Sequence, residues 1–305
     1  VLCKGSRSWR SHHLLHDLNN LGYGPRRFAY KDLKKATKGF SKECKLGQGG
    51  FGAVYKGKLG LDHNKKSNNC ETSVEVAVKV LGEHSKQGER EFKAEIESIG
   101  RMRHKNLVQL LGWSYDHWKG QLLLVYEYMP KQSLDMWLNL IGQDGRRAGS
   151  SANDSLSWAA RYHVLKGVAS GLVYLHEEWE MVVVHRDLKP GNIMLDAEFN
   201  AKLGDFGLAR LIKNRDGIFH PGGGRIHDGA SGESTQTATV AGTPGYIAPE
   251  CLETGTITKE SDVYSFGVVA MEVATGRRSF SENLNRLWDL YQENRLIEAA
   301  AADLM

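Results

Sequence analysis

His185 to Asn192 read His-Arg-Asp-Leu-Lys-Pro-Gly-Asn, and Asp205-Phe206-Gly207 follow a short distance downstream. Each stretch comes directly after strand-like residues: Met181 to Val184 precede the first, and two apolar pieces within Ile193 to Leu203, divided by a turn, precede the second. Rigid strands that end in loops are a common support for reactive side chains. Here the two loops carry two carboxylates, an amide and an ammonium group, which suit a divalent cation and a migrating phosphoryl group.

The bulk composition sets bounds on the rest of the chain. Its 305 residues are 41% hydrophobic, enough for one large two-lobed domain or two modest domains. The four cysteines show no CxxC spacing, which argues against a zinc site or a disulfide framework and favours a reducing compartment. No apolar run approaches the ~20 residues that span a bilayer, so we expect the chain as given to be soluble. Because it begins at Val1 without an initiator methionine, we expect a fragment of a longer product.

Positive charge is concentrated near the N-terminus. Residues 1–45 hold eleven lysines or arginines and three acidic residues, a net +8, whereas the remainder is net −4. A basic arm on a mildly acidic globule suits a negatively charged surface, such as the cytoplasmic face of a membrane. A solvated basic linker is the alternative that the same charges allow.

Strand signals and two helices are predicted in the first part of the chain. Residues 28–40 place apolar side chains on one helical face, with Asp32 as a candidate cap and Gly39 as a candidate end. A second helix is predicted over Glu89 to Met102. Strands are predicted around residues 53–59, 74–80, 107–111 and 122–126, and the polar residues 61–72 are expected to be a loop insertion.

The second part of the chain is predicted to be mainly helical. Helices are expected over Ser133 to Ile141, Trp158 to His176 and Val263 to Thr275. Gln143 to Asp154 is expected to be a loop insertion, and Leu211 to Thr239 a mobile segment, because both are poor in large apolar residues.

A glycine-rich stretch, Leu46 to Val54, contains the pattern G-x-G-x-x-G. A dinucleotide-binding loop with this pattern would be followed by a helix. Because residues 53–59 instead alternate like a strand, we expect Gly47, Gly49 and Gly52 to shape a hairpin whose backbone N–H groups cover phosphates. An ordinary glycine turn is the simpler alternative.

Lys79 lies in the middle of the apolar strand Val76-Ala77-Val78-Lys79. Burial of an ammonium group is costly unless it is paired, and Glu95 on the following helix is the natural partner. Glu91 and Glu97 on the same helix are expected to face solvent.

The polar groups of the second lobe have distinct chemical capacities. Asp187 can accept a proton from an attacking hydroxyl, and Lys189 can neutralise a moving phosphoryl group. Asn192 and Asp205 offer the hard oxygen ligands that Mg²⁺ prefers. Asp187 alone would be an ordinary turn residue; the surrounding motif makes that alternative weak.

The full set of motifs resembles the protein kinases: the glycine loop, VAVK, the helical Glu95, HRDLKPGN, DFG and Ala248-Pro249-Glu250, in that order from about Phe40 onward. Lys189 and the stretch Gly242 to Tyr246 resemble the serine/threonine-specific branch. The stretches GPRRFAYKDLKKATKGFS, LHEEWEMVVVHRDLKPGNIMLD and ITKESDVYSFGVVAMEVATGRR resemble plant receptor-like kinases with a legume-type (L-type) lectin ectodomain.

This resemblance implies an α+β, bilobal kinase fold. The expected divisions are a basic juxtamembrane-like arm over residues 1–39, a small β-rich N-lobe with one key helix over residues 40–127, and a larger, mainly helical C-lobe over residues 128–305. The implied activity is transfer of the ATP γ-phosphate to protein serine or threonine hydroxyls in cell-surface receptor signalling. The full-length receptor would be anchored by a transmembrane segment that this chain lacks, with the kinase on the cytoplasmic side of the plasma membrane.

The resemblance also assigns site residues. Asp187 would be the catalytic base, Lys79 would hold the α/β-phosphates, Glu95 would orient Lys79, and Asn192 and Asp205 would bind Mg²⁺, with Mn²⁺ as a substitute. The remaining ATP contacts would be Leu46, Gly47, Gly49 and Gly52 over the phosphates, Val54, Ala77 and Met194 around the adenine, Glu127 and Met129 in the hinge behind Tyr126, and Asp135 at the ribose.

Activation by phosphorylation is expected because the charge of Arg186 could pair with a phosphate on the loop beyond DFG. The expected acceptors in that loop are Ser231, Ser234, Thr235, Thr237 and Thr239. Partners would be protein substrates and a second copy of the chain during autophosphorylation. No nucleic-acid partner is expected.

Two departures from the family pattern support an alternative. Asp205 to Glu250 spans 46 residues, with a glycine-rich surplus around Ile218 to Gly232, and the C-lobe stops at Met305 where the family continues. His220 and His227 in the surplus are not expected to bind metal, because no further ligands accompany them. The alternative is a truncated kinase-like module that binds nucleotide or partners with little or no catalysis.

Overall fold

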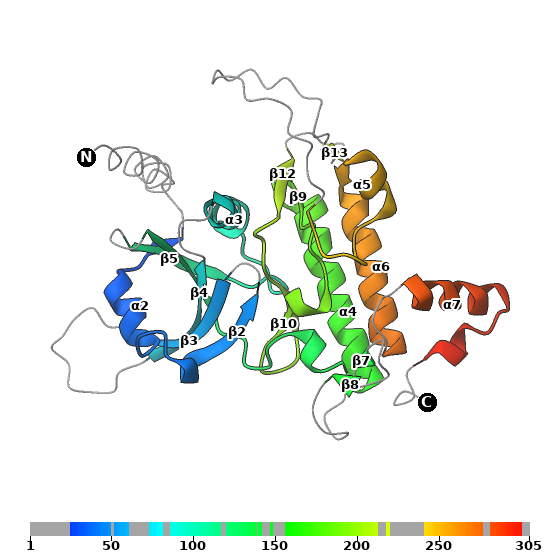
Figure 1. The fold of residues 1–305 in the computed structure, drawn as a ribbon, viewed down its shortest axis with the longest axis horizontal. Coiled ribbons are helices and arrows are strands. Elements are labelled where there is room, and N and C mark those ends of the chain that lie inside the picture. Colours follow the sequence, from blue (N-terminus) through cyan, green and yellow to red (C-terminus); the bar gives the residue numbers. More distant parts are fainter. Residues whose placement is uncertain are drawn as a thin grey trace, which may run out of the picture. The chain divides into compact units, whose positions relative to one another are not determined.

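The computed structural model describes residues 25–49, 52–60, 73–81, 86–116, 120–138, 140–141, 147–148, 156–212, 218–219, 241–276 and 281–300. Expectations for residues 1–24, for the insertion at 61–72 and for the five loop acceptors lie outside these ranges. The chain forms two compact units, Val1–Arg103 with Gln109–Tyr128, and His104–Val108 with Met129–Met305. The first is rich in strands and the second is mainly helical, so the predicted α+β class is confirmed (Figure 1).

A six-stranded sheet forms the body of the first unit. Its strands lie in the order β1-β5-β6-β4-β3-β2, and every neighbouring pair is antiparallel except β1 with β5. The strands are β1 (Arg26–Arg27), β2 (Lys45–Gly49), β3 (Gly52–Gly60), β4 (Ser73–Leu81), β5 (Leu110–Asp116) and β6 (Gln121–Glu127), and a short 3₁₀ turn, η1 (Lys42–Cys44), precedes β2.

The predicted strand at 107–111 is wrong in its start. Leu107 forms a parallel bridge with Leu203, and Val108 N donates to Leu203 O at 2.8 Å, so these two residues belong to the second unit. The strand of the first unit begins only at Leu110.

The helix α2 (Tyr30–Ala36) covers one face of the sheet. Leu33 is fully buried against Val76 and Val78 of β4 and Leu123 of β6. The predicted helix is confirmed, but its predicted cap is wrong: Ala29 holds the N-cap position, and Asp32 lies in the first turn. Residues just before the kinase motifs are therefore an integral part of the first unit's core.

The helix α3 (Lys86–Ile99) begins three residues before its predicted start. Phe92, Ile96 and Ile99 are buried, and Phe92 packs edge-on against Trp113 of β5. Glu97 is exposed as predicted, but Glu91 is only 1% exposed, so the expectation that Glu91 faces solvent is wrong. The buried face of α3 therefore includes Glu91 beside the apolar residues that the sequence pattern identified.

Two helices form the centre of the second unit. In Figure 1, α4 (Trp158–Val173) and α6 (Lys259–Thr275) lie side by side. Arg161 of α4 is 1% exposed and joins them, since its Nη1 donates to Val273 O at 2.8 Å. Both predicted helices are confirmed, although α6 starts four residues early because Thr258 caps it by accepting from Ser261 N.

Short strands and helices connect and extend this pair. The strands predicted before the two motif loops are confirmed. They are β9 (Val182–Val184) before the first loop, and β10 (Ile193–Leu195) and β11 (Ala201–Leu203), which form an antiparallel hairpin, before the second. The full set of elements that connect and extend the two helices is η2 (Leu134–Met136), β7 (Leu140–Ile141), β8 (Arg147–Ala148), η3 (Tyr174–Glu178, a π-helical turn), β9 (Val182–Val184), η4 (Pro190–Asn192), β10 (Ile193–Leu195), β11 (Ala201–Leu203), β12 (Arg210–Ile212), β13 (Ile218–Phe219), α5 (Pro249–Thr254), β14 (Ile257–Thr258), α7 (Ser281–Gln292) and η5 (Leu296–Ala299).

One sequence-based expectation for this unit is wrong, and two others lie mostly outside the described residues. The helix predicted over Ser133 to Ile141 is only the turn η2, because Ser133 forms a strand-type bridge with Met194 and the chain then enters β7. Of the segment Leu211 to Thr239, which is predicted to be mobile, the structure describes the end of β12, where Ile212 is buried, and β13; its other residues lie outside the described ranges. Of the predicted loop insertion at 143–154, only β8 is described. Within the described ranges, every helix falls short of the length and apolarity that a membrane crossing needs.

Candidate active site

Lys79 and Glu95 form a buried ion pair in the first unit. Lys79 Nζ lies 2.7 Å from Glu95 Oε1, and the two residues are 8% and 0% exposed. The strand β4 and the helix α3 supply one residue each, so the pairing predicted from the sequence is confirmed. Because a charge this deeply buried is costly unless paired, the pair fixes the position of a single ammonium group on the sheet.

The glycine stretch forms the β2–β3 hairpin, as its strand-like continuation predicted. Gly47 lies opposite Val54, and Gly49 lies opposite Gly52. Of Gly47, Gly49 and Gly52, only Gly52 must be a glycine for steric reasons. Its φ is +132°, and a Cβ there would lie 2.0 Å from Val80 O. A Cβ at Gly47 or Gly49 would meet nothing within 4 Å. The contacts of the fold therefore do not require glycine at these two positions.

Several predicted adenine contacts share one face of the first unit's sheet. Val54 lies directly opposite Lys79, and Ala77 is two residues from Lys79 along β4, so their side chains point to the same side. Both are half-buried, as is Leu46 in β2. At the end of β6, Glu127 Oε1 accepts from Gln109 N at 2.7 Å, and its backbone N–H donates to Gln109 O.

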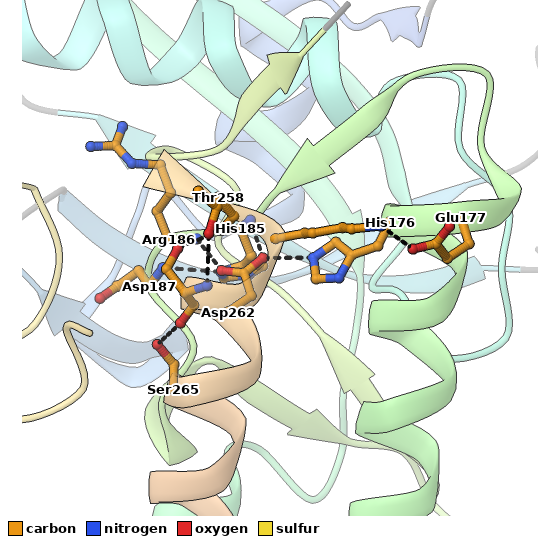
Figure 2. A network of polar contacts seen from close by, with 10 residues as sticks. His176, Glu177, His185, Arg186, Asp187, Thr258, Asp262 and Ser265 are labelled. Carbon is orange, nitrogen blue, oxygen red and sulfur yellow. Dashed lines mark hydrogen bonds and ion pairs between the residues drawn. The ribbon is translucent and has the colours of Figure 1, made fainter. Parts of the chain in front are cut away.

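In the second unit, the backbone of His185 and Arg186 is held by Asp262 of α6. Figure 2 shows this carboxylate surrounded by donors. Asp262 Oδ2 accepts from His185 N at 2.7 Å, Asp262 Oδ1 accepts from Arg186 N at 2.9 Å, and His176 Nε2 lies 2.9 Å from Oδ2. Asp262 is 0% exposed. The sequence did not single out Asp262 or His176; an acidic residue in the first turn of a helix looks like an ordinary dipole partner.

His185 joins the two motif loops. Its Nδ1 accepts from Asp187 N at 3.3 Å, so the ring proton is assigned to Nε2, which donates to Gly204 O at 3.0 Å. The ring also packs edge-on against Phe206, 4.7 Å between centroids, and Phe206 is 0% exposed. His185 therefore links the backbone at Asp187 to Gly204 and Phe206, the two neighbours of Asp205 in the chain.

Asp187 is 3% exposed and has a defined set of donors. Its Oδ1 accepts from the Thr243 hydroxyl at 2.5 Å, and its Oδ2 accepts from Lys189 Nζ and Asn192 Nδ2, each at 2.8 Å. Lys189 Nζ also donates to Thr243 Oγ1 at 2.7 Å. A threonine hydroxyl thus already occupies the position from which a hydroxyl can transfer its proton to Asp187.

The residues predicted to bind a divalent cation suit Mg²⁺. Both hydrogens of the Asn192 amide are directed to Asp187, to its backbone oxygen and to Oδ2, which leaves the Asn192 amide oxygen as a hard ligand. Asp205 follows the β10–β11 hairpin and holds a left-handed backbone at φ +60°, a strained conformation of the kind found at functional positions. No group of three or more His, Cys, Asp or Glu side chains suited to a metal occurs in the described parts of the chain.

The other predicted nucleotide contacts of the second unit lie close to the catalytic loop. Met129 is buried, and Met194 is half-buried on β10. Asp135 Oδ1 is a buried oxygen that accepts no hydrogen bond, and a Cβ at Gly191 would lie 3.9 Å from Asp135 Oδ2. An acceptor left open in this way suits a hydroxyl donor.

Arg186 lies where positive charge is disfavoured. Burial, reinforced by the nearby Arg210, lowers the pKa of Arg186 to about 10. Its φ is +72°, and Nη1 donates to Leu208 O at 3.1 Å. Two guanidinium groups close together would be stabilised by an anion.

Comparison with known proteins agrees with this geometry. A profile described as "Protein kinase domain" matches residues 40–301. L-type lectin-domain containing receptor kinase IX.1 of Arabidopsis thaliana is 45% identical over 288 residues, covering 91% of this chain and 38% of the relative. L-type lectin-domain containing receptor kinase SIT1 of Oryza sativa subsp. japonica is 47% identical over 265 residues, covering 87% of this chain and 34% of the relative. The chain thus spans little more than a third of the curated relatives it matches.

Proposed function

This chain belongs to the protein kinase family, and we propose that it transfers the γ-phosphoryl group of ATP to serine and threonine hydroxyls of proteins. The observation that carries the acceptor choice is the Thr243 hydroxyl held 2.5 Å from Asp187 Oδ1 and 2.7 Å from Lys189 Nζ. The surroundings of the base are therefore complementary to a short aliphatic hydroxyl.

The residues divide the reaction between them. Asp187 accepts the proton that the substrate hydroxyl loses as its oxygen attacks the γ-phosphorus and the bond to ADP breaks. Lys189 places its positive charge beside the transferring group, and Lys79, oriented by Glu95, holds the α/β-phosphates. Asp262 keeps the loop backbone fixed, so that Asp187 needs no rearrangement before it acts.

Asn192 and Asp205 would hold the divalent cation that the family uses, and we propose Mg²⁺, with Mn²⁺ as a substitute. A cation held by these two residues would neutralise charge that develops on the transferring phosphoryl group. The glycine hairpin with Leu46, the side chains of Val54, Ala77 and Met194, the hinge residues Glu127 and Met129, and Asp135 are proposed to bind the remainder of the nucleotide.

Activation by loop phosphorylation is part of the same proposal. The closeness of Arg186 to Arg210, and the burial that lowers the pKa of Arg186, favour an anion at this position. A phosphate on the loop between DFG and Ala248-Pro249-Glu250 would supply it.

The biological setting is proposed from the relatives. Their names describe receptor kinases with a lectin domain. We propose that this chain is the kinase portion of such a plant receptor, placed on the cytoplasmic side of the plasma membrane, with autophosphorylation between two copies as one of its reactions.

The test is transfer of labelled phosphate from Mg²⁺-ATP to peptides that contain serine, threonine or tyrosine. We expect phosphoserine and phosphothreonine with the wild type and neither with Asp187→Asn. A folded sample that binds ATP but transfers nothing would support the alternative of a binding module, and exclusive phosphotyrosine would contradict the acceptor assignment.

A further inference from the structure

Three side chains interlock beside the proposed nucleotide site of the second unit. The rings of Trp137 and Phe199 meet edge to face, with centroids 4.8 Å apart and planes at 84°. Lys131 Nζ lies 4.8 Å from the Phe199 centroid and 5.5 Å from the Trp137 centroid, within the range of a cation–π contact. Trp137 Nε1 also donates to Lys131 O at 2.7 Å. We call Lys131, Trp137 and Phe199 the aromatic clamp.

The backbone on both sides of the clamp is strained. Gln132 has φ +58° and Phe199 has φ +63°, although neither is glycine. Left-handed conformations of such residues persist only where surrounding contacts enforce them, and they concentrate at functional positions. At Phe199 the enforcing contact is Asp196, whose Oδ1 accepts from Glu198 N and Asn200 N. This turn places the Phe199 ring against Trp137 and Lys131.

The clamp joins the segment 129–135 to the β10–β11 hairpin. We call the line along which these two segments pair the seam. Along this seam Leu195 N donates to Gln132 O at 2.8 Å, Lys131 N donates to Leu195 O at 3.3 Å, and Ser133 bridges Met194. Both sides of the seam carry proposed nucleotide contacts, namely Met129 and Asp135 on one side and Met194 on the other.

We propose that Lys131, Trp137 and Phe199 are positioning residues, which fix Asp135 and Met194 in the arrangement that binds the ribose and base of the nucleotide. This inference rests on the proposed function. Asp135 supports it, because an acceptor oxygen that is buried without a hydrogen bond must be held at one place to meet a ligand hydroxyl. The clamp itself need not touch the nucleotide; it acts through Asp135 and Met194.

The test measures binding of ADP and 2′,3′-dideoxy-ADP, which cannot be turned over, to the full chain by calorimetry. The wild type is expected to bind ADP about tenfold more tightly than the dideoxy compound, because Asp135 loses its hydroxyl donors. Lys131→Met and Phe199→Leu should each weaken ADP binding about fivefold, and the preference for ADP should shrink to about twofold. Lys131→Arg should keep both values, since a guanidinium also stacks on aromatic rings.

The matched control is Lys166→Met, which removes a similar contact over Tyr162 on the exposed side of α4. It should leave both affinities unchanged. The inference is overturned if the wild type shows no preference for ADP, if both clamp variants keep the wild-type preference, or if Lys131→Met alone has an effect, which would mean that its charge acts directly on the phosphates. Failure of the wild type to bind either nucleotide would instead contradict the proposed function.

Discussion

At the scale of single residues, the buried Lys79–Glu95 pair affects stability, and we propose that it also positions Lys79 at the nucleotide phosphates. Both groups are almost fully buried, and their separation is 2.7 Å. Replacing a buried ion pair by apolar side chains is often neutral for stability, whereas removing one partner is strongly destabilising. The pair therefore allows its two purposes to be measured separately.

Lys79→Met should lower the free energy of unfolding by about 3 kcal/mol, because the Glu95 carboxylate loses its partner in a buried position. The double variant Lys79→Met/Glu95→Leu should recover most of that loss in urea denaturation. Neither variant should recover ATP affinity, since both lack the ammonium group. Recovery of ATP binding in the double variant would show that Lys79 has no role at the phosphates.

His104 predicts a dependence of stability on pH. Burial, the largest cause, lowers the pKa of His104; its ring stacks on Tyr174 at 4.6 Å, and its Nδ1 accepts from Asn106 N. The unfolded chain therefore binds a proton at His104 at higher pH than the folded chain does. The contribution of neutral His104 to the free energy of unfolding is complete above pH 6.5, and it is lost as the pH falls below that value.

The measurement is urea denaturation between about pH 7 and pH 5. In His104→Gln the fall in unfolding free energy across this range should be smaller than in the wild type. Parallel pH profiles of the two proteins would refute the assignment to His104.

At the scale of elements, the β2–β3 hairpin contains one glycine that the fold requires, Gly52, and others that we propose to contact the nucleotide, such as Gly49. Gly52→Ala should destabilise the first unit by about 2 kcal/mol or more, because its Cβ would meet Val80 O and its φ is +132°. Gly49→Ala should leave stability within about 0.5 kcal/mol but raise KM for ATP, since the added methyl group enters open space on the hairpin. Thermal unfolding and steady-state kinetics of the two variants check this contrast, and equal effects on both measurements would contradict it.

The helix α6 contributes to chemistry through Asp262 without contacting a substrate. Asp262→Asn replaces one acceptor oxygen by an NH₂ group that must face the donors His185 N, Arg186 N or His176 Nε2. We expect a loss of about 2 kcal/mol in stability and a drop of about a hundredfold in kcat, because Asp187 is displaced. KM for ATP should change little.

Glu260→Gln is the control for this variant. It makes the same change of charge in the same helical turn, at an exposed position. A similar loss of kcat in both variants would point to a general charge effect rather than to the hydrogen bonds of Asp262.

At the scale of the whole molecule, each of the two units has its own core, and the segment before the kinase motifs belongs to the first. Leu33→Ala should cost about 2–5 kcal/mol, because it leaves a cavity between α2 and the sheet. Lys34→Ala, exposed on the same helix, should stay within about 0.5 kcal/mol. Urea denaturation measures both, and an effect of Leu33→Ala as small as that of Lys34→Ala would mean that α2 is dispensable for this core.

Much of the active chemistry is readable in the sequence because it depends on residue type and order. Asp187, Asn192 and Asp205 lie in loops after short strands, and the hairpin, the helices α4 and α6 and the Lys79–Glu95 pair followed from periodicity and the cost of buried charge. What could not be predicted depends on contacts between distant segments. Glu91 is buried against expectation, and Ser133 to Ile141 is not a helix because Ser133 is paired with a strand sixty residues away in the chain.

The family and the order of the motifs could be read from the amino-acid sequence, as could the groups that we propose for phosphoryl transfer, since these depend on which side chains occur and at what spacing. How those groups are held became visible only in the folded chain. Asp262 of α6 accepts hydrogen bonds from the backbone of His185 and Arg186. Phe199, in a strained turn, contacts Lys131 and Trp137. The reason is physical: such contacts join residues far apart in the chain, and a local pattern carries no record of which distant donor meets which acceptor.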